Sequence, residues 1–225
     1  MMLVFDLDDT LYPEASFVDS GFRAVADHLG PVLMADPKEI LERLRAVLIA
    51  DGRGQVFDRV LEDYGALSPA LVADALDVYR THMPDLELFP GVRSMLETLA
   101  ASGLFLVSDG DPAVQARKIA ALEIAPYFTE IYRTWSFGRE AGKPSLHCFE
   151  LILGITGGTW ADLVYVGDDP NKDFVSLRRV GATTVRVHTG RFADVVAEAG
   201  YDADLHVDMV TDVPALLGIE SAGAG

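Results

Sequence analysis

Short apolar runs alternate with amphipathic segments over most of the second half of the chain. Runs at 104–107, 163–166 and 183–187 have the length of single buried strands, and a further short strand is expected near 130–133. Strands that are apolar on both faces are typical of a parallel sheet covered by helices on both sides. With the opening run at 2–5, the pattern predicts an α/β fold built on a doubly wound, mainly parallel, Rossmann-like sheet.

The segments between these strands are expected to be the helices that cover the sheet. Asp111-Pro112 is typical of a helix start, because an aspartate accepts from the free N–H groups and proline fits the first turn. The expected helices of this part lie at 91–102, at 112–122, from about Ser145 onward, at 171–180 and at 192–199.

Residues 14–85 carry no strand pattern. Their apolar residues fall in four stripes at helical spacing, with breaks near Gly30-Pro31 and Asp51-Gly52. We therefore expect an all-helical insert at 14–85 in an α/β core made of 1–13 and 86–225. The last residues, 221–225, are expected to be a frayed tail.

Composition and charge limit the partners. The chain has 225 residues, of which 50% are hydrophobic, and a formal charge of −17 from 35 acidic and 18 basic residues. Such a charge disfavours nucleic acid and anionic membranes as partners. The sequence has no run typical of a transmembrane helix or signal peptide, and its single cysteine, Cys148, excludes an intramolecular disulfide. We expect a cytoplasmic protein that is a monomer or a homodimer.

The first strand runs directly into the acidic segment Asp6-Leu7-Asp8-Asp9-Thr10. Alternation along an extended chain puts Asp6 and Asp8 on one side, with Leu7 on the other. Two carboxylates held this close repel each other unless a metal ion or a shared proton relieves them. Carboxylate oxygens are the ligands that Mg²⁺ prefers, so the segment indicates a metal site.

Polar residues also follow two other predicted strands. Ser108 follows the strand at 104–107, and Asp168 follows the strand at 163–166. Because the carboxyl ends of parallel strands meet at one edge, these clusters and the first are expected to converge there. Lys143, just before an expected helix, brings a cation to the same edge. Carboxylates, a hydroxyl and a lysine together favour metal-assisted phosphoryl transfer.

These residues resemble the motifs of a known family. The four motifs of the haloacid dehalogenase-like (HAD) hydrolase superfamily are similar, in order, to Asp6-x-Asp8-x-Thr10, Ser108, Lys143-Pro144 and Gly167-Asp168-Asp169-x-x-x-Asp173. The resemblance covers nearly the whole chain. The helical insert between the first two motifs resembles the helical cap of one HAD subfamily.

The resemblance implies roles for the first motif. Asp6 is expected to be the nucleophile that takes the phosphoryl group as an aspartyl-phosphate. Asp8 is expected to protonate the leaving alcohol and then to activate the hydrolytic water. Thr10 is expected to brace the loop, and Asp9 to be a spacer that faces away from the site.

The resemblance also implies a phosphate-binding set of Ser108, Asp109 and Lys143. Ser108 is expected to hydrogen-bond a phosphoryl oxygen, and Lys143 to neutralise charge on the nucleophile and the phosphate. The family usually has Asn at the position of Asp109, so this side chain either points away from the phosphate or interacts with the loop.

The same resemblance implies a Mg²⁺ site formed by Asp6, the backbone carbonyl of Asp8, and Asp168. Asp169 and Asp173 are expected to be supporting acids, one of which completes the acidic side through water or by orienting the lysine. Many relatives carry Ser or Asn at the position of Asp169, and the sequence leaves open which of the two acids acts.

The function that these expectations favour is a Mg²⁺-dependent phosphatase acting on a small phosphorylated metabolite through an aspartyl-phosphate. Asp8 argues against a dehalogenase, whose leaving halide needs no proton. A phosphomutase or phosphotransferase on the same fold, and a non-catalytic binding protein, remain alternatives. Tyr12, Phe17 and Phe22 fit either a substrate pocket or the core of the insert.

Overall fold

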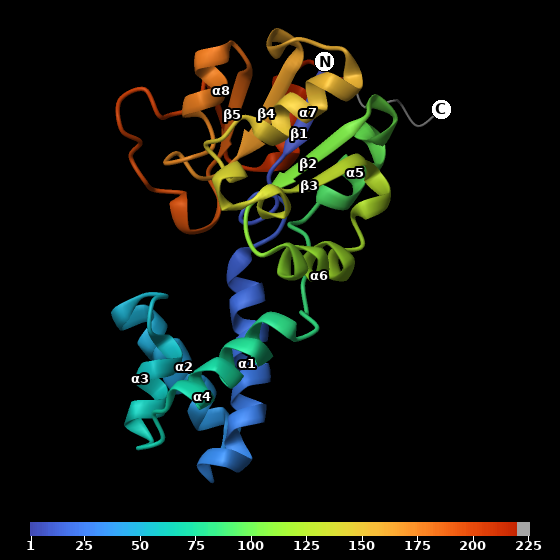
Figure 1. Ribbon diagram of the computed structural model, residues 1–225. Coiled ribbons are helices and arrows are strands. Elements are labelled where there is room, and N and C mark those ends of the chain that lie inside the picture. Colours follow the sequence, from blue (N-terminus) through green and yellow to red (C-terminus); the bar gives the residue numbers. More distant parts are fainter. Residues whose placement is uncertain (220–225) are drawn as a thin grey trace. The chain divides into compact units, whose positions relative to one another are not determined.

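A computed structural model describes residues 1–219, so the tail expected at 221–225 lies outside the described residues. The chain forms two compact units. One joins Met1–Glu14 to the chain from Glu87 onward, and the other consists of Ala15–Leu86. Figure 1 shows that the first unit is built from strands and helices and that the second is helical.

The sheet of the first unit has six strands within the described residues, and every neighbouring pair is parallel. Their order, β3-β2-β1-β4-β5-β6, reverses direction beside β1, which is the doubly wound arrangement. The predicted fold is therefore confirmed, and the short edge strand β6 is an addition to it. The strands are β1 (Met2–Phe5), β2 (Leu104–Ser108), β3 (Phe128–Arg133), β4 (Leu163–Gly167), β5 (Thr183–Val187) and β6 (Leu205–Val207).

The register of the central strands brings their polar ends together. Phe5 at the end of β1 lies opposite Leu106 of β2 and Val166 of β4. The backbone N–H of Asp6 donates to the carbonyl of Val166 at 2.8 Å, which extends the pairing by one residue. The residues that follow β1, β2 and β4 consequently share one edge of the sheet.

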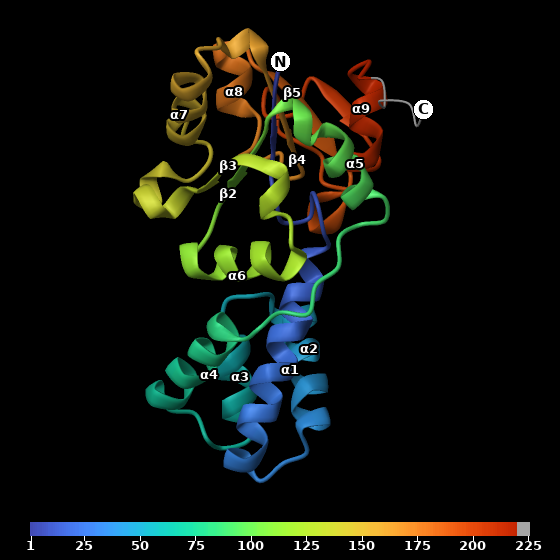
Figure 2. The ribbon, with the colours of Figure 1, turned by 90° about the vertical axis from the view of Figure 1, so that its right-hand side faces the viewer.

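Helices cover both faces of this sheet. Figure 2 shows α7 and α8 on one side and α5 and α9 on the other. On the first side, Val4 and Tyr165 of the sheet pack with Phe149 of α7 and with Phe174. The helices are α5 (Val92–Leu99), α6 (Pro112–Leu122), α7 (His147–Thr156), α8 (Val175–Val180) and α9 (Val213–Leu216). Short 3₁₀ helices lie at Ala100–Ser102, Ala125–Tyr127, Thr134–Phe137, Arg139–Ala141, Trp160–Asp162, Gly190–Phe192 and Val210–Asp212.

The prediction of a helix at 192–199 is wrong. After the 3₁₀ helix at Gly190–Phe192 the chain runs through turns without an α-helix. The buried guanidinium of Arg186 donates to the carbonyls of Phe192 at 2.8 Å and Val195 at 2.7 Å, which removes acceptors that a helix would use. Val196 is 92% exposed, so burial of its side chain gives a helix here no support.

The second unit is a bundle of helices around its own core. Asp36 and Ser68 cap the second and fourth helices through bonds to Lys38 N and Leu71 N. Phe22 is buried in this core. The buried ring of Phe17 lies 5.6 Å from that of Tyr79. The helices are α1 (Glu14–Leu33), α2 (Pro37–Asp51), α3 (Val56–Asp63) and α4 (Pro69–Thr81). Among the described residues, none of the helices has the length and hydrophobicity needed to span a bilayer.

Candidate active site

A cavity of about 110 Å³ lies at the carboxyl ends of β1, β2 and β4. Its lining is mostly acidic, with two cations at its side. This places a concentration of negative charge at the edge of the sheet where open parallel sheets bind ligands. The lining residues are Asp6, Asp8, Asp9, Glu14, Asp109, Asp168, Asp169, Lys172, Arg191 and Phe192.

Asp6 and Lys143 form a buried ion pair at the base of this cavity. The Lys143 ammonium lies 2.9 Å from Asp6 Oδ1 and 2.8 Å from Asp173 Oδ1. It also donates to the Tyr165 hydroxyl at 2.7 Å, and only 1% of its side chain is exposed. One cation is thus shared by two buried carboxylates, which leaves the cluster with excess negative charge.

The pKa values of the cluster reflect this excess. Burial raises the pKa of Asp6 to about 7, even though Lys143 acts to lower it. Burial, followed by the charges of Asp173 and Asp6, raises the pKa of Asp168 to about 9. Burial acts to lower the pKa of Lys143, but the two carboxylates beside it hold that pKa well above its usual value. The group therefore favours either extra protons or an additional cation.

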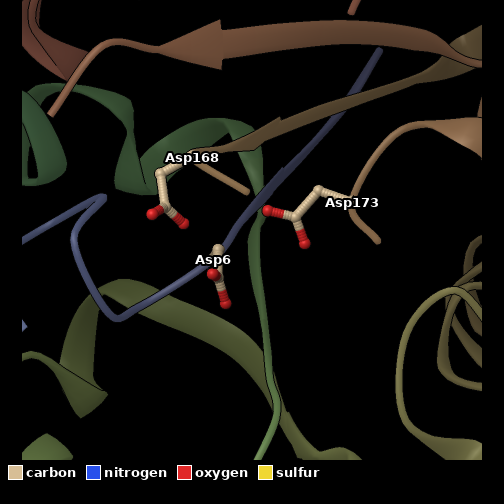
Figure 3. A group of neighbouring side chains, drawn as sticks. All are labelled: Asp6, Asp168 and Asp173. Atoms are coloured by element: carbon tan, nitrogen blue, oxygen red, sulfur yellow. The ribbon is translucent and has the colours of Figure 1, made fainter. Parts of the chain in front are cut away.

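Three carboxylates of this cluster are placed for a metal ion. Oxygen atoms of Asp6, Asp168 and Asp173 all lie within 4.8 Å of one another, and Figure 3 shows Asp6, which follows β1, gathered with Asp168 and Asp173, which both follow β4. Asp173 is also fully engaged elsewhere, since Oδ1 pairs with Lys143 and Oδ2 accepts from Asp169 N at 2.9 Å. A donor set made only of carboxylate oxygens fits Mg²⁺.

Asp8 lies at the same cavity with a separate set of partners. Its Oδ1 pairs with the Lys118 ammonium at 2.7 Å and accepts from the Tyr12 hydroxyl, and its Oδ2 accepts from Gln115 Nε2 at 2.8 Å. Burial acts to raise the pKa of Asp8, but these partners, Lys118 above all, bring it below its ordinary value. The two acids of the first motif thus have contrasting surroundings.

Gln115 and Lys118 were not predicted as site residues. A signal for them does exist, because they share a helical stripe with the buried Ile119 and Leu122, at spacings of three, four and seven. Two polar residues on the core-facing stripe of a helix need buried partners. Asp8 is one such partner for both of them.

Ser108 is the last residue of β2, and Asp109 follows it and lines the cavity. The buried Ser108 Oγ lies 2.6 Å from Gln115 Nε2. Asp109 Oδ1 accepts from Thr134 Oγ1 at 2.7 Å and from Lys143 N at 3.1 Å. The Asp109 carboxylate therefore interacts with the loop that carries the lysine, which was one of the two options that the sequence left open for it.

The last motif contributes a further cation. The Lys172 ammonium lies 3.2 Å from Asp109 Oδ2 and 4.0 Å from Asp169 Oδ2, and it lines the cavity. Asp169 Oδ1 accepts from Asn171 N at 3.0 Å and from Asn171 Nδ2 at 2.8 Å. Asp169 thus shapes its own turn. Sequence reasoning did not single out Lys172, although it lies inside the motif.

The side chains of Thr10 and Asp9, in the loop after β1, differ in their contacts. Thr10 is buried, but its Oγ1 makes no hydrogen bond with the described residues. Asp9 was expected to face away from the site without a role. It is buried at a φ of 54°, its Oδ1 accepts from Glu14 N at 2.8 Å, and its Oδ2 accepts from Arg191 N at 3.3 Å. Asp9 therefore ties this loop to the start of α1 and to the cavity rim.

The parallel sheet, with the four sequence motifs at one of its edges, can be compared with known protein families. A family model described as haloacid dehalogenase-like hydrolase matches residues 1–181. The chain belongs to this family of hydrolases.

Curated relatives narrow the comparison. The chain is 31% identical over 200 residues to a glyceraldehyde 3-phosphate phosphatase of Methanocaldococcus jannaschii, a match covering 86% of this chain and 87% of the relative. It is also 31% identical over 202 residues to a protein of the same name from Methanopyrus kandleri, with 86% of each chain covered. A phosphoserine phosphatase of Thermus thermophilus is 26% identical over 140 residues, which cover 61% of this chain and 55% of that protein.

Solved structures share the fold at lower identity. The HAD hydrolase YfnB of Bacillus subtilis, bound to magnesium, matches with a TM-score of 0.70 and 16% identity over 97% of this chain and 98% of that one. A 2-haloacid dehalogenase of Pseudomonas syringae matches with a TM-score of 0.63 and 24% identity over 96% and 97%. At these identities the likeness supports the fold alone.

Proposed function

We propose that this protein is a Mg²⁺-dependent phosphatase that hydrolyses a small phosphomonoester through an aspartyl-phosphate on Asp6. The observation that carries the proposal is the pairing of buried Asp6 with Lys143 at 2.9 Å beside Asp168, while Asp8 at the same cavity pairs with a different cation, Lys118. A nucleophilic carboxylate with a counter-charge and a separate proton carrier is what two-step phosphoryl transfer needs.

Asp6, Asp168 and the backbone carbonyl of Asp8 are the groups that we propose to hold Mg²⁺. Bound there, the ion would neutralise charge on the phosphoryl oxygens and polarise the phosphorus centre. Asp173 is proposed as a supporting acid that orients Lys143, because both of its oxygens are already engaged. Asp169 is proposed to shape the turn around it.

In the first half-reaction a carboxylate oxygen of Asp6 attacks phosphorus, and the bond from phosphorus to the alcohol oxygen breaks. Asp8 gives a proton to that leaving oxygen, and this step uses its protonated form, which the pairing with Lys118 makes the minor form before substrate binds. Lys143 offsets negative charge on the nucleophile and the phosphoryl group, and the hydroxyl of Ser108 donates to a phosphoryl oxygen. The products are the free alcohol and the aspartyl-phosphate.

In the second half-reaction water attacks the phosphorus of the aspartyl-phosphate. Asp8 now takes a proton from that water, and the bond from phosphorus to the Asp6 oxygen breaks. Inorganic phosphate leaves, and Asp6 returns to its carboxylate form. The ion pair from Asp8 to Lys118 at 2.7 Å supports a carboxylate that is ionised at this stage.

The substrate is proposed to be a small phosphorylated metabolite. The relatives from Methanocaldococcus jannaschii and Methanopyrus kandleri bear the name glyceraldehyde 3-phosphate phosphatase, and the relative from Thermus thermophilus bears the name phosphoserine phosphatase. The cavity of about 110 Å³ is below the range of about 300–1,000 Å³ usual for small-molecule pockets, so it suits a phosphoryl group more than a whole metabolite. We propose residues 1–13 and 86–225 as the catalytic core of a cytoplasmic enzyme and residues 14–85 as its cap.

Phosphate release from a panel of phosphomonoesters tests the proposal. Glyceraldehyde 3-phosphate and phosphoserine lead the panel, with Mg²⁺ or with excess EDTA. We expect Mg²⁺-dependent turnover that Asp6→Asn abolishes and that Asp208→Asn, a change at an exposed acid outside the site, leaves intact. Equal background rates for the wild type and Asp6→Asn on every substrate would overturn the proposal.

A further inference from the structure

The face of α6 toward the cavity holds Asp8 by both of its oxygens. Lys118 Nζ lies 2.7 Å from Asp8 Oδ1, and Gln115 Nε2 lies 2.8 Å from Asp8 Oδ2. The two residues are three apart on the helix, so their side chains lie on one face. Each carboxylate oxygen therefore has its own anchor on a single rigid element.

Burying Lys118 and Gln115 on α6 is unfavourable in free energy. Lys118 is 4% exposed and Gln115 is 1% exposed. Burying an ammonium is strongly unfavourable unless a charge and hydrogen bonds compensate for it, and an apolar residue there would pack against the core without that cost. The remaining buried positions of α6, Ile119 and Leu122, are apolar. Packing alone therefore gives no reason for a lysine or a glutamine.

Gln115 also links Asp8 to β2. Its Nε2 lies 2.6 Å from Ser108 Oγ and 2.8 Å from the carbonyl of Asp109. A single amide thus connects the residue proposed to move protons with the residue proposed to hold a phosphoryl oxygen. Displacing this amide would change the relative position of the two groups.

We propose that Gln115 and Lys118 are positioning residues that fix the Asp8 carboxylate where the leaving oxygen of the substrate departs. This inference rests on the proposed phosphatase function and adds two residues to it. Both residues act through Asp8, whose oxygens they bind, and neither is given a proton-transfer or nucleophilic step of its own. The Tyr12 hydroxyl also donates to Oδ1, but the two α6 residues hold both oxygens from one rigid element, so the loss of either one widens the range of orientations that the carboxylate samples.

The dependence of rate on the leaving group tests the inference. A p-nitrophenolate leaves without a proton, whereas the more basic phenolate from phenyl phosphate gains more from a positioned acid. We expect Lys118→Met and Gln115→Leu to lower kcat/KM for phenyl phosphate by roughly 10- to 100-fold, and for p-nitrophenyl phosphate by less than about threefold. This ratio reports the steps up to release of the alcohol, so slow hydrolysis of the aspartyl-phosphate does not mask it.

Three control variants separate positioning from loss of structure. Lys118→Arg keeps a cation within reach of Asp8 and should recover most of the phenyl phosphate rate. Arg117→Met removes a charge from the same helix, where the arginine bonds Ala113 O, and should change neither rate. In an Asp8→Asn background, Lys118→Met and Gln115→Leu should cause no further loss that is selective for phenyl phosphate, because their effect passes through Asp8.

Equal losses for both aryl phosphates would overturn the positioning role, and so would a selective loss that persists in the Asp8→Asn background. Melting temperatures of all variants identify any that fail to fold, and Lys118→Gln then replaces Lys118→Met. A wild-type protein that hydrolyses neither substrate with Mg²⁺ would instead contradict the proposed function itself, which keeps the two failures distinct.

Discussion

Replacing Asp168 by asparagine should stabilise the metal-free protein. Asp168 is buried at the end of β4, close to Asp6 and Asp173. Burial and these two charges raise its pKa from 3.8 to about 9. Folding therefore favours a protonated Asp168, while the unfolded chain favours an ionised one, and the amide removes this conflict.

The raised pKa sets the size of the effect. At about pH 8 some four pKa units separate the solution from the unfolded carboxyl, and each unit corresponds to about 1.4 kcal/mol, which gives an upper value of about 6 kcal/mol. The charge of Asp6, whose own pKa is raised to about 7, is one cause of the raised pKa of Asp168, so the two carboxyls do not titrate independently. We therefore expect Asp168→Asn to gain roughly half of that value, about 3 kcal/mol, in the free energy of unfolding.

The raised pKa values also determine in which direction the free energy of unfolding changes with pH. Because the folded pKa values of Asp6 and Asp168 are raised, the folded state binds more protons than the unfolded chain between about pH 4 and pH 9. In the metal-free wild-type protein, the stability that these two groups contribute is therefore fully present below this window and is lost as the pH rises through it. Asp168→Asn should lack most of that slope, whereas Asp208→Asn, at an exposed position, should keep it.

Urea unfolding in excess EDTA and in Mg²⁺ provides the assay. The wild type should gain stability from Mg²⁺, more at about pH 8 than at about pH 5, because ligands must be deprotonated to bind. Asp168→Asn should lose this gain. The reasoning fails if the variant is less stable than the wild type in EDTA across the whole pH range, or if its response to Mg²⁺ is unchanged.

Three further substitutions test separate parts of the structure. Lys143→Met leaves two buried carboxylates without their cation and should cost about 3–5 kcal/mol of unfolding free energy together with all turnover; normal stability would contradict this. Asp9→Ala removes the acceptor for two backbone N–H groups and should cost about 1–2 kcal/mol in urea unfolding, and an unchanged midpoint would refute that role. Leu44→Ala in the helical core should cost about 2–5 kcal/mol, against less than about 0.5 kcal/mol for Ile49→Ala on its surface; equal costs would show that the core is misplaced.

Much of the sheet could be predicted because its strands are buried on both faces. The strand expected at 183–187 matches β5, and those at 104–107 and 163–166 match β2 and β4 to within one residue. Once the order of parallel strands is known, the residues after β1, β2 and β4 must share one edge. The approach of Asp6, Lys143 and Asp168 could therefore be anticipated from short motifs.

What could not be predicted depends on contacts between distant segments. The helix expected at 192–199 does not form, because the guanidinium of Arg186 on β5 donates to the carbonyls of Phe192 and Val195, which a helix would use as acceptors. Lys118 is 110 residues from Asp8 in sequence. Its position on the buried stripe of a helix shows that it needs a partner, but the sequence does not identify Asp8 as that partner. The carboxylate of Asp109 is likewise explained by its bond to Lys143 N, which no local pattern encodes.

Trapping the aspartyl-phosphate tests the central claim most directly. Wild-type protein is mixed with Mg²⁺ and a substrate from the panel and is quenched in acid within one turnover. The protein is then digested, and the masses of its peptides are measured by mass spectrometry. A phosphoryl group on the carboxylate of Asp6, absent from Asp6→Asn and enriched in Asp8→Asn when an aryl phosphate with a good leaving group is used, is the predicted result. Turnover of the substrate with no phosphoryl group on Asp6 at any quench time, or with the group on another residue, would contradict the account.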